Sequence, residues 1–74
     1  MIVYSQTTCA PCATLKKYLD HKGVKYIERN ITDHPEHIET LLKHTGGRIL
    51  VPTVVKGKDV VVGLNWGAIS KLIS

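Results

Sequence analysis

The sequence predicts an α/β fold in which a four-stranded mixed sheet is flanked by three helices, in the order βαβαββα. Two observations predict it. Short runs rich in β-branched residues alternate with stretches whose apolar residues recur at helical spacing, and glycine or proline marks most junctions. The chain has 74 residues, enough for one domain with one modest core. We therefore predict a single domain over residues 1–74.

The first half of the chain predicts a strand, a helix and a second strand. Ile2 to Ser5 is a short β-type run. The helix is expected from Pro11 to Lys22 and should end at Gly23, because proline suits a first turn and glycine a helix end. Its apolar positions on one face are Cys12, Leu15 and Leu19. Val24 to Ile31 is strand-like, and a right-handed crossover would pair the two strands in parallel.

A second helix is expected in the middle of the chain. Asp33-His34-Pro35-Glu36 has the pattern of a capping box, and Gly46-Gly47 is expected to end the helix that follows. The apolar positions on one side of this helix are Ile38, Leu41 and Leu42.

A hairpin and a last helix complete the order. Val51 to Lys56 predicts a strand, Lys56-Gly57-Lys58-Asp59 a hairpin turn, and Val60 to Val62 the return strand. Asn65 can cap the last helix. The positions of that helix expected to face inward are Trp66, Ile69, Leu72 and Ile73.

Composition narrows the class of protein. Lys and Arg number 10 against 6 Asp and Glu, a formal charge of +4, which favours solubility or the steering of anionic partners. The basic residues are scattered and do not interleave with aromatic residues, so we expect no nucleic-acid binding. No apolar run is long enough to span a membrane, and the N-terminus lacks the pattern of a signal peptide. We expect a cytoplasmic monomer that does not bind membranes.

The two cysteines form a C-x-x-C motif, Cys9-Ala10-Pro11-Cys12, where the first strand meets the first helix. A helix N-terminus offers unpaired N–H groups and a partial positive charge, so we expect the pKa of the Cys9 thiol to lie below that of a free thiol. Pro11 has no N–H, which leaves the Cys12 amide as the expected donor to the Cys9 sulfur. Cys12 lies one turn further on the buried face. This asymmetry predicts thiol–disulfide exchange, with Cys9 as nucleophile and Cys12 as resolving thiol.

Two other interpretations of the pair remain open. The cysteines can be small buried apolar residues without a chemical role. They can also bind copper or zinc in a metal-carrying module. His34 and His37 give an H-x-x-H pattern, but the spacing does not fit a zinc finger. Copper carriers place C-x-x-C between the first strand and helix, although they usually have Met where this chain has Thr7. We predict no metal site.

Four stretches together resemble the glutaredoxin branch of the thioredoxin fold, over essentially the whole chain. They are Val3-Tyr4-Ser5 leading to the C-x-x-C motif, Val51-Pro52-Thr53, Lys56-Gly57 and Val62-Gly63-Leu64. The chain is similar to short glutaredoxin-like proteins, which border on small redoxins that donate electrons to ribonucleotide reductase. The resemblance implies a thioredoxin-like fold and a redox cycle between dithiol and disulfide with no bound cofactor.

The resemblance also implies a substrate groove beside the cysteines. Val51-Pro52 should be a cis peptide that faces the C-x-x-C motif, and the backbone of Val51 should pair with the substrate chain. Arg48, in the loop before this proline, is a candidate contact for a substrate carboxylate. The far side of the groove should be lined by Gly63, Leu64 and Asn65.

Departures from the glutaredoxin pattern leave the electron donor open. Many glutaredoxins have a glutathione-binding Lys where this chain has Gln6, which we take as the candidate contact there. Many also have an acidic pair in the stretch that here reads Val62 to Trp66. The proline directly before Cys12 is instead like thioredoxin, which is strongly reducing. The expected partners are disulfide-containing proteins, with a thioredoxin-type reductase as donor or glutathione as donor and co-substrate.

Overall fold

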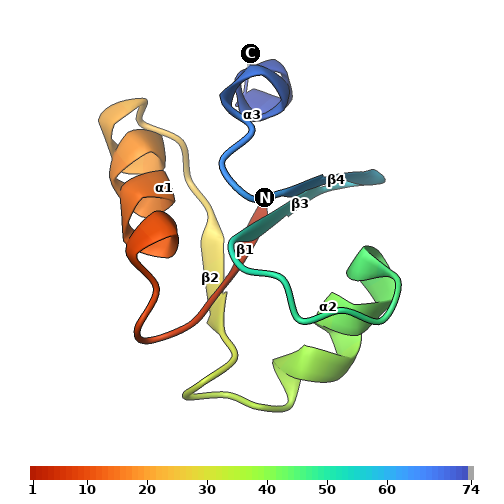
Figure 1. Cartoon of the computed structure of the whole chain (residues 1–74). Helices are drawn as coiled ribbons and strands as arrows, with labels where there is room; N and C mark the ends of the chain where they lie inside the picture. Colours follow the sequence, from red (N-terminus) through yellow and green to blue (C-terminus); the bar gives the residue numbers. More distant parts are fainter. Residues whose placement is uncertain (74) are drawn as a thin grey trace.

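The structure, a computed structural model, describes residues 1–73 and confirms the predicted fold class (Figure 1). A four-stranded sheet and three helices follow each other in the predicted order within these residues. The elements are β1 (Ile2–Ser5), α1 (Ala10–His21), β2 (Ile27–Asn30), α2 (His37–Thr45), β3 (Thr53–Lys56), β4 (Asp59–Val62) and α3 (Trp66–Ile73). None of the three helices in residues 1–73 combines the length and apolar character needed to cross a membrane.

The sheet is mixed, with the strand order β2-β1-β3-β4. β1 and β2 run parallel, as predicted for a strand–helix–strand crossover, whereas β3 is antiparallel to both β1 and β4. In this register Tyr4, near the end of β1, lies opposite Thr53, the first residue of β3. The loop that leaves β1 and the loop that enters β3 therefore meet at one edge of the sheet.

Helices cover both faces of the sheet, α1 and α3 on one side and α2 on the other (Figure 1). Successive strand residues point to opposite faces, so Val3 and Tyr4 belong to different cores. The core under α1 and α3 consists of Val3, Leu15, Leu19, Val54, Val61, Ile69 and Leu72. The smaller core under α2 consists of Tyr4, Ile31, Leu41 and Val55.

The capping box predicted over residues 33–36 is wrong. α2 begins at His37, and Glu36 at its N-cap makes no side-chain hydrogen bond to the helix. Because proline disfavours the helical conformation of the residue before it, Pro35 keeps His34 out of the helix. The side-chain oxygen of Asn30 instead accepts hydrogen bonds from the N–H groups of Thr32 (2.9 Å) and Asp33 (3.2 Å), which makes a turn after β2.

Two strands are shorter than predicted. β2 begins at Ile27 and not at Val24, because the Val24 N–H donates to the carbonyl of Leu19 (3.0 Å) and belongs to the end of α1. β3 begins at Thr53, after the Val51-Pro52 peptide.

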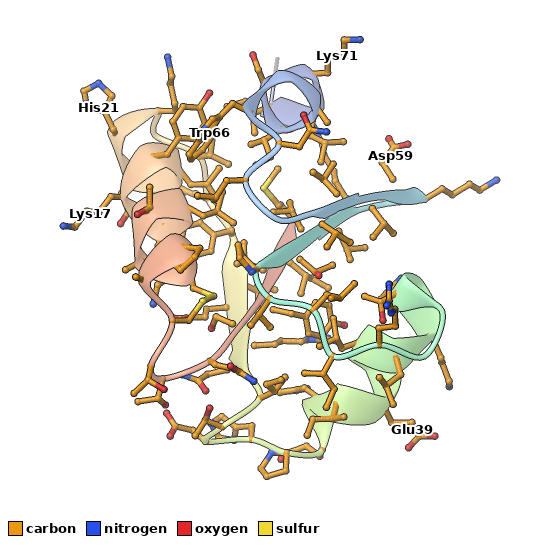
Figure 2. The ribbon with its side chains drawn as sticks, in the orientation of Figure 1. Lys17, His21, Glu39, Asp59, Trp66 and Lys71 are labelled. Atoms are coloured by element: carbon orange, nitrogen blue, oxygen red, sulfur yellow. A yellow bond between two sulfur atoms is a disulfide. The ribbon has the colours of Figure 1, made fainter. Side chains whose placement is uncertain are left out.

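The last helix begins as predicted but faces the core differently at its first residue. The side-chain oxygen of Asn65 accepts a hydrogen bond from the Ala68 N–H (3.2 Å), which confirms the predicted cap. Ile69 is buried as expected, whereas Trp66 is 39% exposed. The Trp66 ring packs against Tyr18 of α1, with 4.7 Å between ring centroids, and lies between α1 and α3 (Figure 2).

Candidate active site

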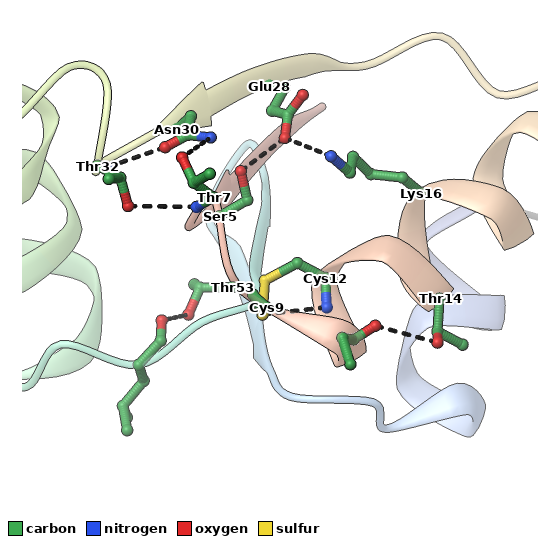
Figure 3. The surroundings of a disulfide bond; sticks show 12 residues. Ser5, Thr7, Cys9, Cys12, Thr14, Lys16, Glu28, Asn30, Thr32 and Thr53 are labelled. Atoms are coloured by element: carbon green, nitrogen blue, oxygen red, sulfur yellow. Dashed lines mark hydrogen bonds and ion pairs between the residues drawn. A yellow bond between two sulfur atoms is a disulfide. The ribbon is translucent and has the colours of Figure 1, made fainter.

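The two cysteines lie where β1 passes into α1 and are joined by a disulfide (Figure 3). Their Cα atoms are 5.2 Å apart. Cys9 is the N-cap residue of α1, in an extended conformation, and its sulfur accepts a hydrogen bond from the Cys12 N–H at 3.1 Å. This confirms the predicted donor. The sulfur of Cys9 thus takes the place that a side-chain oxygen usually takes at a helix start.

The two cysteines differ in solvent exposure. Cys12 is 1% exposed and shares the inner face of α1 with Leu15 and Leu19. Cys9 is only partly covered. A molecule that approaches this edge of the sheet therefore meets Cys9 first, while Cys12 stays behind it within bonding distance.

Polar side chains at the end of β2 hold the loop that carries Cys9 (Figure 3). The Thr7 N–H donates to the hydroxyl oxygen of Thr32 (3.2 Å), and the side-chain amide of Asn30 donates to the Thr7 hydroxyl (3.3 Å). The Ile31 N–H donates to the Ser5 carbonyl at 2.8 Å. Sequence reasoning missed these contacts. The one available signal was that parallel strands end at the same edge, so that polar residues after β1 and β2 come together.

An ion pair lies beside the cysteine-bearing segment (Figure 3). Ser5 is fully buried, and its hydroxyl donates to the Glu28 carboxylate at 2.7 Å. Lys16, one turn after Cys12 on α1, donates to the same oxygen at 2.8 Å. The hydrogen bond from Lys16, followed by that from Ser5, holds the pKa of Glu28 below its usual value. The cluster therefore keeps a charged carboxylate between β2 and α1.

The Val51-Pro52 peptide is cis, which confirms the expectation from the resemblance. Pro52 is buried, and its carbonyl accepts a hydrogen bond from the Gly63 N–H at 2.8 Å. This bond continues the β3–β4 pairing by one step and places Gly63 beside Pro52. The hydroxyl of Thr53 donates to the Leu50 carbonyl at 2.7 Å. Pro52 and Gly63 thus lie together at the end of the sheet where the chain also leaves β1.

The remaining predicted site residues have different surroundings. Gln6 is partly buried directly after β1, and Arg48 is exposed in the loop between α2 and β3. Leu64 packs against the core under α1 and α3. Asn65 is exposed, but its side-chain oxygen is engaged in the cap of α3. Their predicted contacts with a substrate stay predictions.

No cluster of metal ligands accompanies the cysteines in the described part of the chain. Within residues 1–73, no three His, Cys, Asp or Glu side chains are grouped to hold a metal ion. His34 and His37 have ring centroids 5.9 Å apart, and His34 lies 3.5 Å from the Glu36 carboxylate. His34 and His37 thus contact each other before and at the start of α2 and do not belong to the helix that carries the sulfurs.

Comparisons with known proteins agree with the fold and with the geometry of the cysteine pair. Residues 1–61 match the family model Glutaredoxin. An uncharacterized glutaredoxin-like 8.6 kDa protein in the rubredoxin operon of Clostridium pasteurianum is 32% identical, over 96% of this chain and 93% of the relative. The glutaredoxin-like protein NrdH of Lactococcus lactis subsp. cremoris is 29% identical, over 95% of this chain and 94% of its own length.

Solved structures are similar over the same extent. The crystal structure of the thioredoxin-like protein BC3987 has a TM-score of 0.85 and 31% identity, with 96% of each chain covered. Fold, close cysteine pair and sequence thus agree, and the chain belongs to the glutaredoxin family.

Proposed function

We propose that the chain is a thiol–disulfide oxidoreductase that reduces protein or small-molecule disulfides, with Cys9 as nucleophile and Cys12 as resolving thiol. The observation that carries the proposal is the asymmetry of the pair, in which a partly exposed Cys9 caps a helix and a buried Cys12 lies behind it. Membership of the glutaredoxin family supports the reaction class. No bound cofactor is needed, since the two sulfurs carry the electrons themselves.

The reaction proceeds in two exchange steps. In the reduced protein, the Cys9 thiolate attacks one sulfur of the substrate disulfide, whose S–S bond breaks. The other substrate sulfur leaves as a thiolate and takes a proton from water. Cys12 then loses its proton and attacks the Cys9 sulfur of the mixed disulfide, which releases the second substrate thiolate. The protein is left with the Cys9–Cys12 disulfide seen in the structure, and two electrons have passed to the substrate.

The start of α1 favours the charged form of the attacking sulfur. The Cys12 N–H already points at Cys9, and a helix N-terminus stabilises negative charge. We therefore expect the pKa of the Cys9 thiol in the reduced protein to be lower than that of a free thiol. The rate of Cys9 alkylation by iodoacetamide as a function of pH measures it, and a midpoint at or above pH ~8.5 would contradict it.

We infer that a thioredoxin-type reductase, and not glutathione, restores the dithiol. The support is that Gln6 replaces a cationic glutathione contact, and that the stretch from Val62 to Trp66 contains no acidic residue. Supplying each donor separately in a turnover assay tests this. Efficient turnover with glutathione alone would contradict it.

We place this activity in the cytoplasm, where disulfides are kept reduced.

Trapping distinguishes the two cysteines. Cys12→Ser should accumulate a mixed disulfide between Cys9 and a substrate protein, because nothing resolves it, and non-reducing electrophoresis should detect it. Cys9→Ser is the matched control and should trap nothing, since the remaining sulfur is buried. If neither variant traps a substrate and the wild type does not reduce a protein disulfide such as insulin, the proposed function is wrong.

A further inference from the structure

Two threonine hydroxyls hold the segment that connects α2 to β3. At its start, the Thr45 hydroxyl oxygen accepts a hydrogen bond from the Arg48 N–H (3.2 Å), and the hydroxyl itself donates to the Arg48 carbonyl. At its end, the Thr53 hydroxyl donates to the carbonyl of Leu50 at 2.7 Å. Thr53 is 0% exposed and Leu50 is partly buried, so this second hydrogen bond is partly shielded from water.

The residue between these fixed points is Val51. Its neighbours on both sides have occupied carbonyls, because Leu50 accepts from Thr53 and Pro52 accepts from the Gly63 N–H. Within residues 1–73, no hydrogen bond occupies the N–H or the C=O of Val51 itself. The orientation of the Val51 backbone is therefore fixed by hydrogen bonds on both sides. Its N–H and C=O groups remain available to hydrogen-bond a partner.

The Thr53 hydroxyl does not act on the sulfurs directly. Thr53 shares its sheet face with Val55, which belongs to the core under α2, whereas α1 and its cysteines lie on the opposite face. In Figure 3, the dashed line from Thr53 runs away from the disulfide toward the connecting segment. Loss of this hydroxyl should change the connecting segment and leave the Cys9–Cys12 pair unchanged.

We propose that Thr53 is a positioning residue for protein substrates: by holding the Leu50 carbonyl, it fixes the Val51 backbone in the direction that pairs with the substrate chain. This rests on the proposed function and on the expectation, implied by the family resemblance, that the Val51 backbone pairs with the substrate chain. A protein substrate forms backbone hydrogen bonds and therefore requires this orientation of the Val51 backbone. A small disulfide has no peptide backbone and does not require it. Thr53 thus affects recognition of the substrate chain and not the exchange chemistry.

The test compares a protein substrate with a small one. Thr53→Val replaces the hydroxyl by a methyl group of similar size, and Thr53→Ser keeps the hydroxyl. The pre-reduced proteins are mixed with insulin or with 2-hydroxyethyl disulfide, and the second-order rate constants of disulfide reduction are measured. Thr40→Val, which removes a hydroxyl on α2 outside this segment, is the control and should match the wild type.

Thr53→Val should reduce insulin about tenfold more slowly, the size expected from misaligned backbone hydrogen bonds, and 2-hydroxyethyl disulfide within about twofold of the wild type. The pH profile of Cys9 alkylation should not move, and Thr53→Ser should restore the insulin rate. An unchanged insulin rate in Thr53→Val, or an equal loss with both substrates, would overturn the proposal.

A second pair of variants protects the test against misfolding. If Thr53→Val does not fold, Thr53→Ala and Thr53→Ser give the same comparison, because both lack the γ-methyl group and differ only in the hydroxyl. Equal insulin rates in these two variants would then overturn the proposal. A wild type that reduces neither insulin nor 2-hydroxyethyl disulfide would instead overturn the proposed function, and this inference with it.

Discussion

Individual residues at this site serve structure and chemistry together. The Cys9 sulfur accepts the hydrogen bond of a helix cap, so the group that is proposed to react is also part of the end of α1. Asn65 likewise caps α3 and belongs to the predicted groove. Ser5 and Lys16 converge on Glu28 next to the cysteine segment. Substitutions at these positions should therefore be measured for stability as well as for activity.

Glu28 should make stability dependent on acidic pH. Its pKa in the folded protein is lowered by Lys16 and by Ser5, so the folded state binds fewer protons than the unfolded state near the usual Glu pKa. The resulting stabilisation is present above the usual Glu pKa of about 4.3 and is lost as the pH falls through the lowered folded value. Glu28→Gln should cost about 0.2–1 kcal/mol at pH 7, the range typical of an ion pair that solvent partly screens.

Urea unfolding at pH 7 and pH 3 measures this effect. The difference in unfolding free energy between the two pH values should be smaller in Glu28→Gln than in the wild type. Glu39→Gln, exposed on α2 and outside this cluster, is the control and should leave the difference closer to that of the wild type. An equal pH dependence in Glu28→Gln and the wild type would show that the ion pair contributes nothing.

Helix ends show which elements the sequence can specify. Gly23, Gly46 and Asn65 were predicted from local patterns and lie at the helix ends as expected, because turns with positive φ and N-caps depend on few neighbouring residues. The predicted capping box failed, since Pro35 and the side chain of Asn30 together favour a turn there. The pattern over residues 33–36 includes Pro35 but not Asn30, so it does not show the turn that competes with the cap.

Two glycines should respond to alanine in opposite directions. Gly67 lies inside α3, and a Cβ there would meet its nearest heavy atom, Oδ1 of Asn65, at an ordinary 3.8 Å. Gly67→Ala should stabilise the protein by about 0.5–1 kcal/mol, through helix propensity. Gly46 ends α2 with φ of +75°, so Gly46→Ala should destabilise it by about 1 kcal/mol. Urea unfolding of both variants gives these values, and two changes of the same sign would contradict this account.

At the scale of the whole molecule, the sheet joins two cores that are small on their own. The element order, the mixed sheet and the cis peptide could be predicted, because periodicity, crossover handedness and the family resemblance determine them. The hydrogen bonds that Thr7 makes with Asn30 and Thr32 could not be predicted, nor could the hydrogen bond from the Thr53 hydroxyl to the Leu50 carbonyl. They depend on the exact positions that side chains take once the strands have paired, and residues 23 or 25 apart, such as Thr7 with Asn30 and Thr32, show no local pattern.

The two cores should unfold together. Leu41 is fully buried under α2, and Leu41→Ala should cost about 2–5 kcal/mol. Trp66, the one tryptophan of the chain, lies with α3 and Tyr18 across the sheet and reports on the other core. In urea, Trp66 fluorescence and far-UV circular dichroism of this variant should shift to the same lower midpoint, as for a two-state domain.

Leu15→Ala, in the core under α1 and α3, is the matched variant. Its two signals should also coincide. A fluorescence midpoint that stays at the wild-type position in Leu41→Ala would show that the two faces unfold independently and would contradict a single domain.

The Gly57-Lys58 turn between β3 and β4 has a practical consequence. Since β3 begins beside the cysteine edge and ends at Lys56, this exposed turn lies at the opposite end of the sheet. A peptide tag inserted after Gly57, for instance, would leave the sulfur pair facing outward. The protein could then be fixed in one orientation on an electrode or a resin, with its redox group toward the solution.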